Sequence, residues 1–479
     1  MPAQSLTTLA AGQKIIDAPA IVALASELRG RILDSGDAGY EDARAIWNGM
    51  VDRRPGLIIR CADADDVASA VRFVGRHRLL VSVRGGGHGI SGNAVCDGGV
   101  MIDLSQMKTV RVDPVARRAR VEPGATLADL DKETQAFGLA VPTGINSTTG
   151  IAGLTLGGGF GWITRKFGLT LDSLVSVDVV TADGEPRRAS ASQNPELFWA
   201  LRGGGGNFGV VTAFEFQLHE VGPQVLAGLV VHPFADAETV LREYREALVA
   251  APDELTCWVV MRQAPPLPFL PVEWHGKEVV ILAMCYCGGM AGGEAATARL
   301  RSIGRPIADV VGKVPFATWQ QAFDPLLAPG ARNYWKSHDF TDLSGKALGV
   351  LTSAAGRLPG PECEVFIAHV GGAAGRVAAE ATAFPQRSSH FVMNVHARWR
   401  EPGMDQACIG WARELFEAAK PYSAGTAYIN FMPADESERV QQAYGGSYRR
   451  LAELKRRYDP SNLFRMNQNV TPTASSQAA

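Results

Sequence analysis

The sequence lacks the features that define several large classes of protein. No apolar run among its 479 residues approaches the roughly 20 that a membrane-spanning helix needs. No Cys-x-x-Cys pair is present, so no metal site is indicated. Lysine and arginine number 47 and aspartate and glutamate 49, which leaves a net charge of −2 and no positive excess to hold a nucleic acid. We therefore expect a chain that has no membrane, nucleic-acid or metal partner.

Disulfides and a secretory signal are also missing from the pattern. The seven cysteines are irregularly spaced, and an odd number does not fit a disulfide framework. The N-terminal segment has no basic stretch followed by an apolar one, as a secretory signal would. Both observations favour a protein of the reducing cytoplasm. Hydrophobic residues make up 46 % of the chain, which excludes disorder for most of it.

Glycine, in contrast, is abundant and clustered. The chain holds 52 glycines, and they gather in the segments 84–93, 142–161 and 201–209. A loop without side chains lets backbone N–H groups converge on an anion such as a pyrophosphate. His88 lies inside the first cluster and is a candidate cofactor contact. The alternatives are a flexible surface turn for the first cluster and a helix C-cap for the third. Neither a Rossmann fingerprint nor a P-loop is present.

The periodicity of apolar residues predicts two α+β regions that meet near residue 221. In the first region, helices are expected at Ile21–Leu33, from an Asp65 cap to His77, and at Leu127–Phe137, and strands at Leu57–Arg60, Leu80–Val83, Val100–Leu104, Ala119–Glu122, Leu174–Thr181 and Gly209–Leu218. In the second, helices are expected at Glu238–Ala250, Glu294–Arg301, Asp405–Lys420 and Glu436–Tyr458, and strands at Leu255–Arg262, Glu278–Cys287, Phe391–Trp399 and Thr426–Phe431. The small polar tail 473–479 is expected to be disordered.

Five segments, taken in order, resemble the berberine-bridge-enzyme-like group of the vanillyl-alcohol-oxidase superfamily. They are Arg-Gly-Gly-Gly-His at 84–88, the glycine-rich run 150–162, Asp-Gly at 183–184, Asn-Pro-Glu-Leu-Phe-Trp-Ala-Leu-Arg-Gly-Gly-Gly-Gly-Asn-Phe-Gly at 194–209, and Tyr-Asp-Pro-Ser-Asn-Leu-Phe at 458–464 with Asn467 and Asn469. The resemblance implies an α+β fold with a two-part PCMH-type FAD-binding domain at 1–220, its core at about 53–222. It also implies an inserted α+β substrate domain at 221–435 whose sheet roofs the flavin, and a return to the FAD domain at 436–472.

The resemblance further implies FAD linked covalently to His88. Many relatives add a second link through a cysteine whose place here is near Asn146. This chain has no cysteine between Cys96 and Cys257, so a single histidine link is expected. The full set expected to bind FAD is His88, Arg84, Gly85, Gly86, Gly87, Gly89, Ser91, Thr143, Gly144, Asn146, Thr148, Gly150, Gly153, Gly157, Gly158, Gly159, Gly209, Val210, Asn467 and Asn469.

The predicted strand 391–399 carries polar residues on one face. Asn394, His396 and Arg398 alternate with apolar neighbours, so they share a face of the strand, which is either solvated or turned toward a substrate. The family places its base on this strand, but the glutamate of berberine bridge enzyme has no counterpart there. His396, with an ordinary pKa near 6.5, is therefore the expected base. Asn394 and Tyr428 complete the catalytic candidates.

Around these candidates, Asn430 is expected to share a strand face with Tyr428, and Trp335 and Lys336 to line the mouth of the site. The implied function is oxidation of a small organic substrate by hydride transfer to FAD, with O₂ as partner and H₂O₂ as product. Three alternatives stay open: a dehydrogenase with another electron acceptor, an oxidative cyclase of secondary metabolism, and a flavin-binding protein without turnover. Neither the substrate nor the oligomeric state follows from the sequence.

Overall fold

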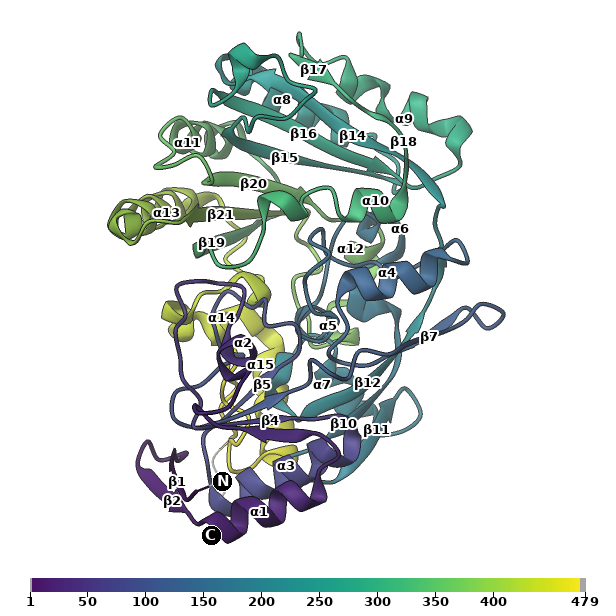
Figure 1. Ribbon diagram of the computed structural model, residues 1–479. Coiled ribbons are helices and arrows are strands. Elements are labelled where there is room, and N and C mark those ends of the chain that lie inside the picture. Colours follow the sequence, from purple (N-terminus) through teal and green to yellow (C-terminus); the bar gives the residue numbers. More distant parts are fainter. Residues whose placement is uncertain (1, 474–479) are drawn as a thin grey trace, which may run out of the picture.

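The computed structural model describes residues 2–473 and stacks two sheet-containing parts, one above the other in Figure 1. The tail expected to be disordered lies, beyond Thr473, outside the described residues. Within residues 2–473, no helix is long and apolar enough to cross a membrane. All seven cysteines are buried and free.

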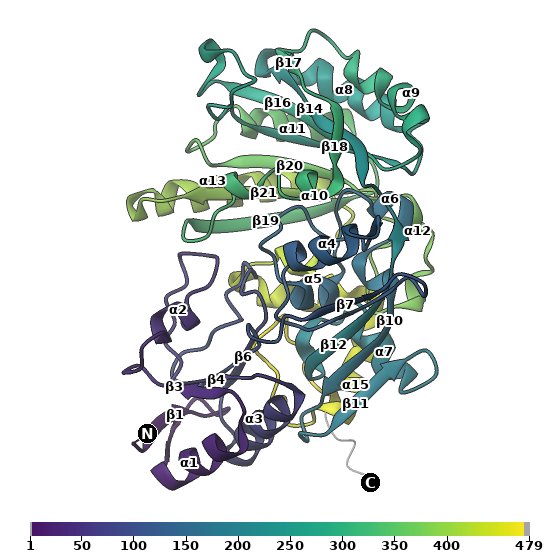
Figure 2. The same cartoon turned by 45° about the vertical axis from the view of Figure 1, so that its right-hand side comes forward.

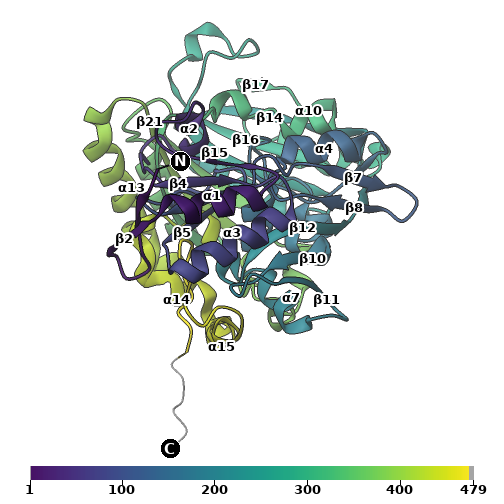
Figure 3. The same cartoon turned by 60° about the horizontal axis from the view of Figure 1, so that its bottom comes forward.

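A small four-stranded sheet lies near the bottom of the molecule, in the order β3–β4–β6–β5. Its strands are β3 (Arg31–Leu33), β4 (Leu57–Arg60), β5 (Val81–Arg84) and β6 (Val100–Asp103). The last three run parallel, and α1 (Ala18–Glu27) and α3 (Ala64–His77) pack together beside them, as Figure 3 shows. The first expected helix therefore ends six residues early, because the chain turns extended at Leu28 and enters β3.

The cap of α3 also differs from the expectation. Asp63, and not Asp65, accepts hydrogen bonds from the backbone N–H groups of Asp65 and Asp66. Asp63 has extended backbone angles, as an N-cap requires, whereas Asp65 is already within the helix. The capping box of Thr126 and Asp129 at the start of α4 (Leu127–Gln135) is present as predicted.

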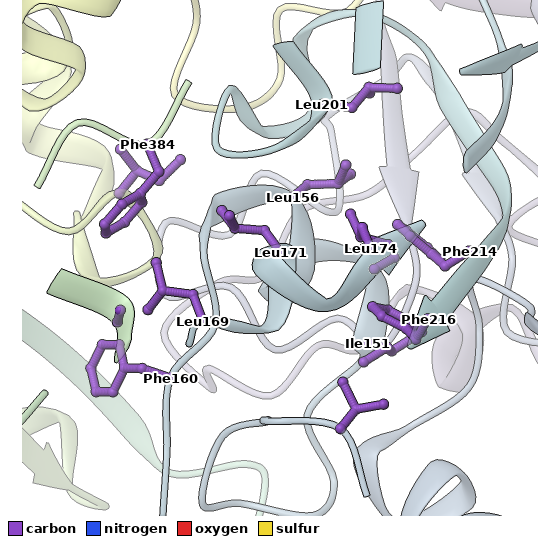
Figure 4. Packing of buried hydrophobic residues seen from close by; sticks show 14 of the residues in the cluster. Ile151, Leu156, Phe160, Leu169, Leu171, Leu174, Leu201, Phe214, Phe216 and Phe384 are labelled. Carbon is purple, nitrogen blue, oxygen red and sulfur yellow. The ribbon is translucent and has the colours of Figure 1, made fainter. Parts of the chain in front are cut away.

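A five-stranded antiparallel sheet follows, in the order β11–β10–β12–β8–β7. Its strands are β7 (Val110–Asp113), β8 (Arg118–Val121), β10 (Leu174–Val180), β11 (Pro186–Ser190) and β12 (Val210–Gln217). Figure 4 shows Phe214 and Phe216 of β12 packing near Leu174 and Ile151. Ile151 begins the short helix α5 (Ile151–Gly157), so this core fixes the second glycine cluster against the sheet.

The upper part is built on an eight-stranded antiparallel sheet in the order β17–β14–β16–β15–β20–β21–β19, with β18 also paired to β14 (Figures 1 and 2). The strands are β14 (Gln224–Pro233), β15 (Leu255–Gln263), β16 (Glu278–Tyr286), β17 (Ala308–Asp309), β18 (Gly312–Pro315), β19 (Arg332–Phe340), β20 (Glu364–His369) and β21 (Phe391–Trp399). Helices α8 (Ala237–Leu248), α9 (Met290–Arg301), α11 (Gly345–Ala355) and α13 (Asp405–Ala419) pack on one face. The opposite face looks toward the glycine-rich segments of the lower part.

The C-terminal segment returns to the lower part, but not as expected. Residues 426–431 form no strand; a short 3-10 turn spans Ile429–Phe431. Tyr428 and Asn430 bond to the glycine cluster instead, since the Tyr428 hydroxyl accepts from Gly159 N–H and Asn430 donates to the Leu154 carbonyl. The expected helix at 436–458 is interrupted at Gly445, which has a φ of +47°, and gives α14 (Val440–Tyr444) and α15 (Tyr448–Tyr458).

Candidate active site

A cavity of about 410 Å³ lies between the two parts of the molecule. Its lower wall is formed by segments that overlap the three glycine clusters, together with a C-terminal segment. These segments are 85–94, 144–162, 205–211 and 428–468. The inner face of the upper sheet supplies its roof, with side chains from β14, β15, β16, β19, β20 and β21. The cavity thus collects segments that lie far apart in the sequence.

Thirteen of the residues expected to bind the cofactor line this cavity. They are Gly85, Gly86, Gly87, His88, Gly89, Ser91, Gly144, Asn146, Gly150, Gly153, Gly209, Val210 and Asn467. At Gly89 and Gly153 an added Cβ would meet no other atom within 4 Å. At Gly86, in contrast, a Cβ would lie 2.5 Å from the backbone of Gly150. Some of these glycines therefore leave room for a ligand, and others let two chain segments touch.

The remaining expected contacts do not line the cavity. Arg84 donates to the Ala43 carbonyl, Thr143 accepts from Gln320, and Thr148 donates to the side-chain oxygen of Asn146. Asn469 also lies outside the lining, as do Gly157, Gly158 and Gly159. For these three glycines the reason is protein packing: a Cβ would meet Asn430 at 2.1 Å, Tyr428 at 2.9 Å and Thr170 at 2.1 Å, respectively.

His88 lies in the lower wall and is partly buried. Its ring stacks on Trp47, with 4.4 Å between centroids. Burial, together with the nearby positive charge of Arg398, lowers the pKa of His88 to about 3, so the ring is neutral. Its Nε2 atom is buried without a hydrogen-bond partner. A neutral ring nitrogen carries the free electron pair that bonding to carbon requires.

The roof carries a charged cluster directly above this wall. On neighbouring strands, Glu364 of β20 pairs with His396 of β21, and Glu364 Oε1 lies 3.2 Å from His396 Nδ1. Arg262 of β15 donates to the other carboxylate oxygen at 2.7 Å. Burial alone would raise the pKa of Glu364, but Arg262 and His396 outweigh it and hold that pKa below its usual value. Glu364 is therefore an anion that accepts from both neighbours.

The second nitrogen of His396 lies beside Asn333 of β19. Asn333 Oδ1 lies 3.2 Å from Nε2, and its orientation is fixed because Asn333 Nδ2 donates to the Ala331 carbonyl. Burial lowers the pKa of His396, although Glu364 acts in the opposite direction. The neutral ring carries one proton, which it can donate either from Nδ1 to Glu364 or from Nε2 to Asn333. Uptake of a second proton lets the ring donate to both acceptors.

The other two catalytic candidates differ in their placement. Tyr428 lines the cavity, and its hydroxyl accepts from Gly159 and from Asn430, each at 2.9 Å. Burial raises the pKa of Tyr428 to about 12, so it stays protonated. Asn394 shares the roof face of β21 with His396 but does not line the cavity, and both its polar side-chain atoms are buried without a partner.

Trp335 and Lys336 fall on opposite faces of β19. Trp335 lines the cavity, as expected, and its ring centroid lies 4.9 Å from that of His396. Lys336 does not reach the site. It is buried on the helix-covered face, where its Nζ atom lies 2.8 Å from Glu436. The alternation of a strand separates these two neighbours.

Comparison with known proteins places this site in a family. A model described as FAD binding domain matches residues 55–190, and one described as berberine and berberine like matches residues 427–471. An FAD-linked oxidoreductase of Dictyostelium discoideum is 31 % identical over 452 residues, which cover 93 % of this chain and 95 % of that protein. (R)-6-hydroxynicotine oxidase of Paenarthrobacter nicotinovorans is 32 % identical over 94 % of this chain and 98 % of its own. The chain belongs to the berberine-bridge-enzyme-like FAD-linked oxidoreductases.

The fold agrees with this assignment. The crystal structure of 6-hydroxy-D-nicotine oxidase from Arthrobacter nicotinovorans superimposes with a TM-score of 0.82 at 30 % identity, covering 93 % of this chain and 98 % of that one. This FAD-linked oxidoreductase therefore has the mixed helix and sheet fold of the PCMH-type FAD oxidases, as the resemblance of its sequence to this family implied.

The residues of this FAD-linked oxidoreductase suit the cofactor. Among the polar atoms of the glycine-rich wall and the C-terminal segment, His88 Nε2, Asn146 Nδ2 and Asn467 Oδ1 are buried and have no protein partner. Buried polar atoms are nearly always satisfied, so these indicate a polar ligand. The open space at Gly89 and Gly153 gives backbone access on the same wall. No cysteine is among the described residues that line the cavity.

Sequence reasoning missed several residues of the site. Glu364 stands at the start of β20, a strand that was not predicted, and only the sheet order brings it beside His396. Arg262 was expected only as the end of a strand. Trp47 follows the short helix α2 (Tyr40–Arg44) and has no periodic pattern around it.

Proposed function

We propose that the protein is a FAD-dependent oxidase of a small organic molecule, with His88 as its single covalent link to the cofactor and O₂ as the electron acceptor. The observation that carries the proposal is that His88 and the His396–Glu364 pair face one cavity from opposite walls. Bound FAD supplies a hydride acceptor for the substrate and passes the electrons to O₂, which gives H₂O₂. The names of the relatives support oxidase chemistry in this family.

The glycine-rich wall would hold the cofactor. His88 is neutral and its Nε2 atom is free of hydrogen bonds, which is the state in which a histidine bonds to carbon. Asn146 and Asn467 each offer an unpaired polar atom to the ligand. A single link is supported by Asn146, which stands near the place where relatives with two links have a cysteine.

His396 is the proposed base. Proton removal from a substrate hydroxyl or amine requires a neutral acceptor, and His396 is neutral above its lowered pKa. Glu364 holds the ring through Nδ1 and stabilises the positive charge that follows proton uptake, as a carboxylate does for a histidine base elsewhere. Arg262 keeps Glu364 ionised.

Tyr428 and Asn394 receive narrower roles. Tyr428 has a pKa of about 12 and is a hydrogen-bond group, not a proton acceptor, at neutral pH. Since Gly159 and Asn430 both donate to it, its own proton is left to donate into the cavity. Asn394 is proposed to act only indirectly, because it does not line the cavity. We also propose that the chain divides into residues 1–220, 221–435 and 436–472. This division follows from which segments form each wall of the cavity.

The test is a spectrum of the purified protein followed by a peroxide assay. We expect a flavin spectrum that stays with acid-precipitated protein, and H₂O₂ formation during turnover. The dehydrogenase alternative predicts slow reoxidation by O₂ in stopped flow and rapid reoxidation by a quinone. A cyclase gives peroxide together with a ring-closed product. A protein without turnover shows no reduction of the flavin by any substrate in the screen.

A further inference from the structure

The roof of the cavity shows where a substrate is accommodated. In the middle of three strands, Leu229, Val260 and Phe366 are half-buried, whereas their strand neighbours on the opposite face are fully buried. All three line the cavity. Apolar side chains at the centre of a sheet stay partly exposed only where they face open space, so this surface is available to a ligand.

A loop extends the apolar surface at one side. Between β15 and β16 the chain places Leu267, Phe269 and Leu270 on the cavity wall. Trp258 of β15 lies next to Phe366, with parallel rings 5.9 Å apart. The substrate side of the cavity is therefore covered by aromatic and aliphatic groups from three strands and a loop.

This surface has few polar groups, and most of them already bond to other protein groups. Among the described residues that line it from 221–426, the charged side chains are Arg262 and Glu364, which pair with each other at 2.7 Å. His396 is held by Glu364. The indole N–H groups of Trp258 and Trp335 are buried without an acceptor. These residues thus offer one proton acceptor and two neutral donors, and no unpaired charge; Tyr428, on the facing wall, adds one hydroxyl donor.

We propose that the substrate is an uncharged aromatic or polycyclic molecule whose single polar group, a hydroxyl or amine on the carbon to be oxidised, faces His396. This inference rests on the proposed function for the position of the reacting carbon. The transfer of an apolar ring from water to such a surface is favourable in free energy. A sugar carries a hydroxyl on nearly every carbon, and each one would lose water here without gaining a partner. Aromatic side chains can also stack against the face of a sugar. The hydroxyls at the edge of the sugar ring would still need polar partners, which this surface lacks.

The chemistry balances for an aryl methanol. The O–H proton goes to His396, the hydride leaves the carbon for FAD, and the substrate becomes an aldehyde. O₂ accepts the two electrons and two protons and becomes H₂O₂. No further reactant is needed.

The experiment compares two neutral probes on the FAD-loaded protein. Binding of 2-naphthalenemethanol and of cellobiose is measured by calorimetry, and peroxide is measured in parallel. We expect the naphthyl probe to bind at least tenfold more tightly. Phe269→Ser removes most of one aromatic wall and is expected to weaken that binding by about tenfold to a hundredfold. Val272→Ser is the matched control, because Val272 lies in the same loop, is 78 % exposed and is not part of the lining.

A second variant guards against misfolding of the first. Val260→Thr keeps the shape of the side chain and adds one hydroxyl to the apolar roof, so we expect several-fold weaker binding of the naphthyl probe. Equal or tighter binding of cellobiose, or equal affinity of Phe269→Ser and Val272→Ser, would overturn the proposal. If peroxide forms from cellobiose alone, the proposed substrate class is wrong, whereas the proposed oxidase function is supported. Tight naphthyl binding without peroxide from any alcohol supports the class and refutes the oxidase.

Discussion

Glu364 on β20 lies directly opposite His396 on β21, with Oε1 3.2 Å from Nδ1, and so places a carboxylate behind a histidine that faces the cavity. The predicted strand 391–399 contains no glutamate, so the sequence offered no carboxylate there. The neighbouring strand supplies the carboxylate instead. The pair forms because antiparallel register brings these two side chains to the same face of the sheet.

The first prediction concerns the link to the flavin. His88→Ala is expected to fold and to release its flavin on acid precipitation, because the other wall residues hold the cofactor only non-covalently. The unmodified protein, treated identically, should keep the yellow colour in the pellet. Flavin that stays covalently attached to the His88→Ala chain would show a second link and exclude the single-link proposal.

The second prediction concerns the base. His396→Ala is expected to slow anaerobic flavin reduction by about 10²–10⁴-fold, which is the usual contribution of a general base. In the unmodified protein the rate should fall as the pH drops through the lowered pKa of His396, so the acidic limb lies below pH 6.5. An unchanged rate accompanied by a lower melting temperature would instead assign His396 a purely structural role.

The third prediction tests the carboxylate behind the base. Glu364 raises the pKa of His396, so Glu364→Gln should move the acidic limb of the reduction rate to still lower pH. The glutamine can still accept from Nδ1, and flavin content should stay the same. A limb that stays in place would mean that the group titrating in the profile is not His396. Measuring the rate at several pH values in both proteins decides this.

The fourth prediction concerns the glycines. Gly153 is exposed to the cavity, and an added Cβ there meets no other atom within 4 Å, so Gly153→Val should fold and bind much less FAD. Gly410→Val in α13 is the matched control, since its Cβ is equally unobstructed but lies away from the cavity. The ratio of flavin to protein absorbance measures both. A full flavin content in Gly153→Val would remove that glycine from the cofactor site.

The fifth prediction is a pH dependence of stability. Burial raises the pKa of Asp131 to about 7, and Gln320 is its hydrogen-bond partner. Between about pH 4 and pH 7 the folded state keeps a proton that the unfolded chain has lost, so stability falls as the pH rises. Asp131→Asn should therefore stabilise the protein at pH 8, by an amount on the order of a few kcal/mol at about 1.4 kcal/mol per pKa unit, and change little at pH 4.

The control for this variant is Glu133→Gln, the same change of charge on the exposed side of α4. It should leave the difference in melting temperature between pH 4 and pH 8 unaltered. If Asp131→Asn shifts the melting temperature equally at both pH values, the carboxyl does not titrate in this range.

The sequence alone determined the family and most of the lower part. Local signals are strong there: the capping box of Thr126 and Asp129, the apolar stripe of α3 and the glycine clusters each depend on neighbouring residues. It also determined the alternation on β21 that turns His396 toward the cavity. These features follow from periodicity and from backbone geometry, which act over a few residues.

Only the tertiary structure decided which groups meet. Glu364 joins His396 through the order of strands β20 and β21, and Trp47 stacks on His88 although 41 positions separate them. The expected strand at 426–431 failed because the side chains of Tyr428 and Asn430 found partners in the glycine cluster, some 270 residues earlier. Likewise, Gly158 proved to accommodate Tyr428 and Phe384. A glycine in the sequence predicts a close approach, but which atoms approach depends on the packing of distant segments.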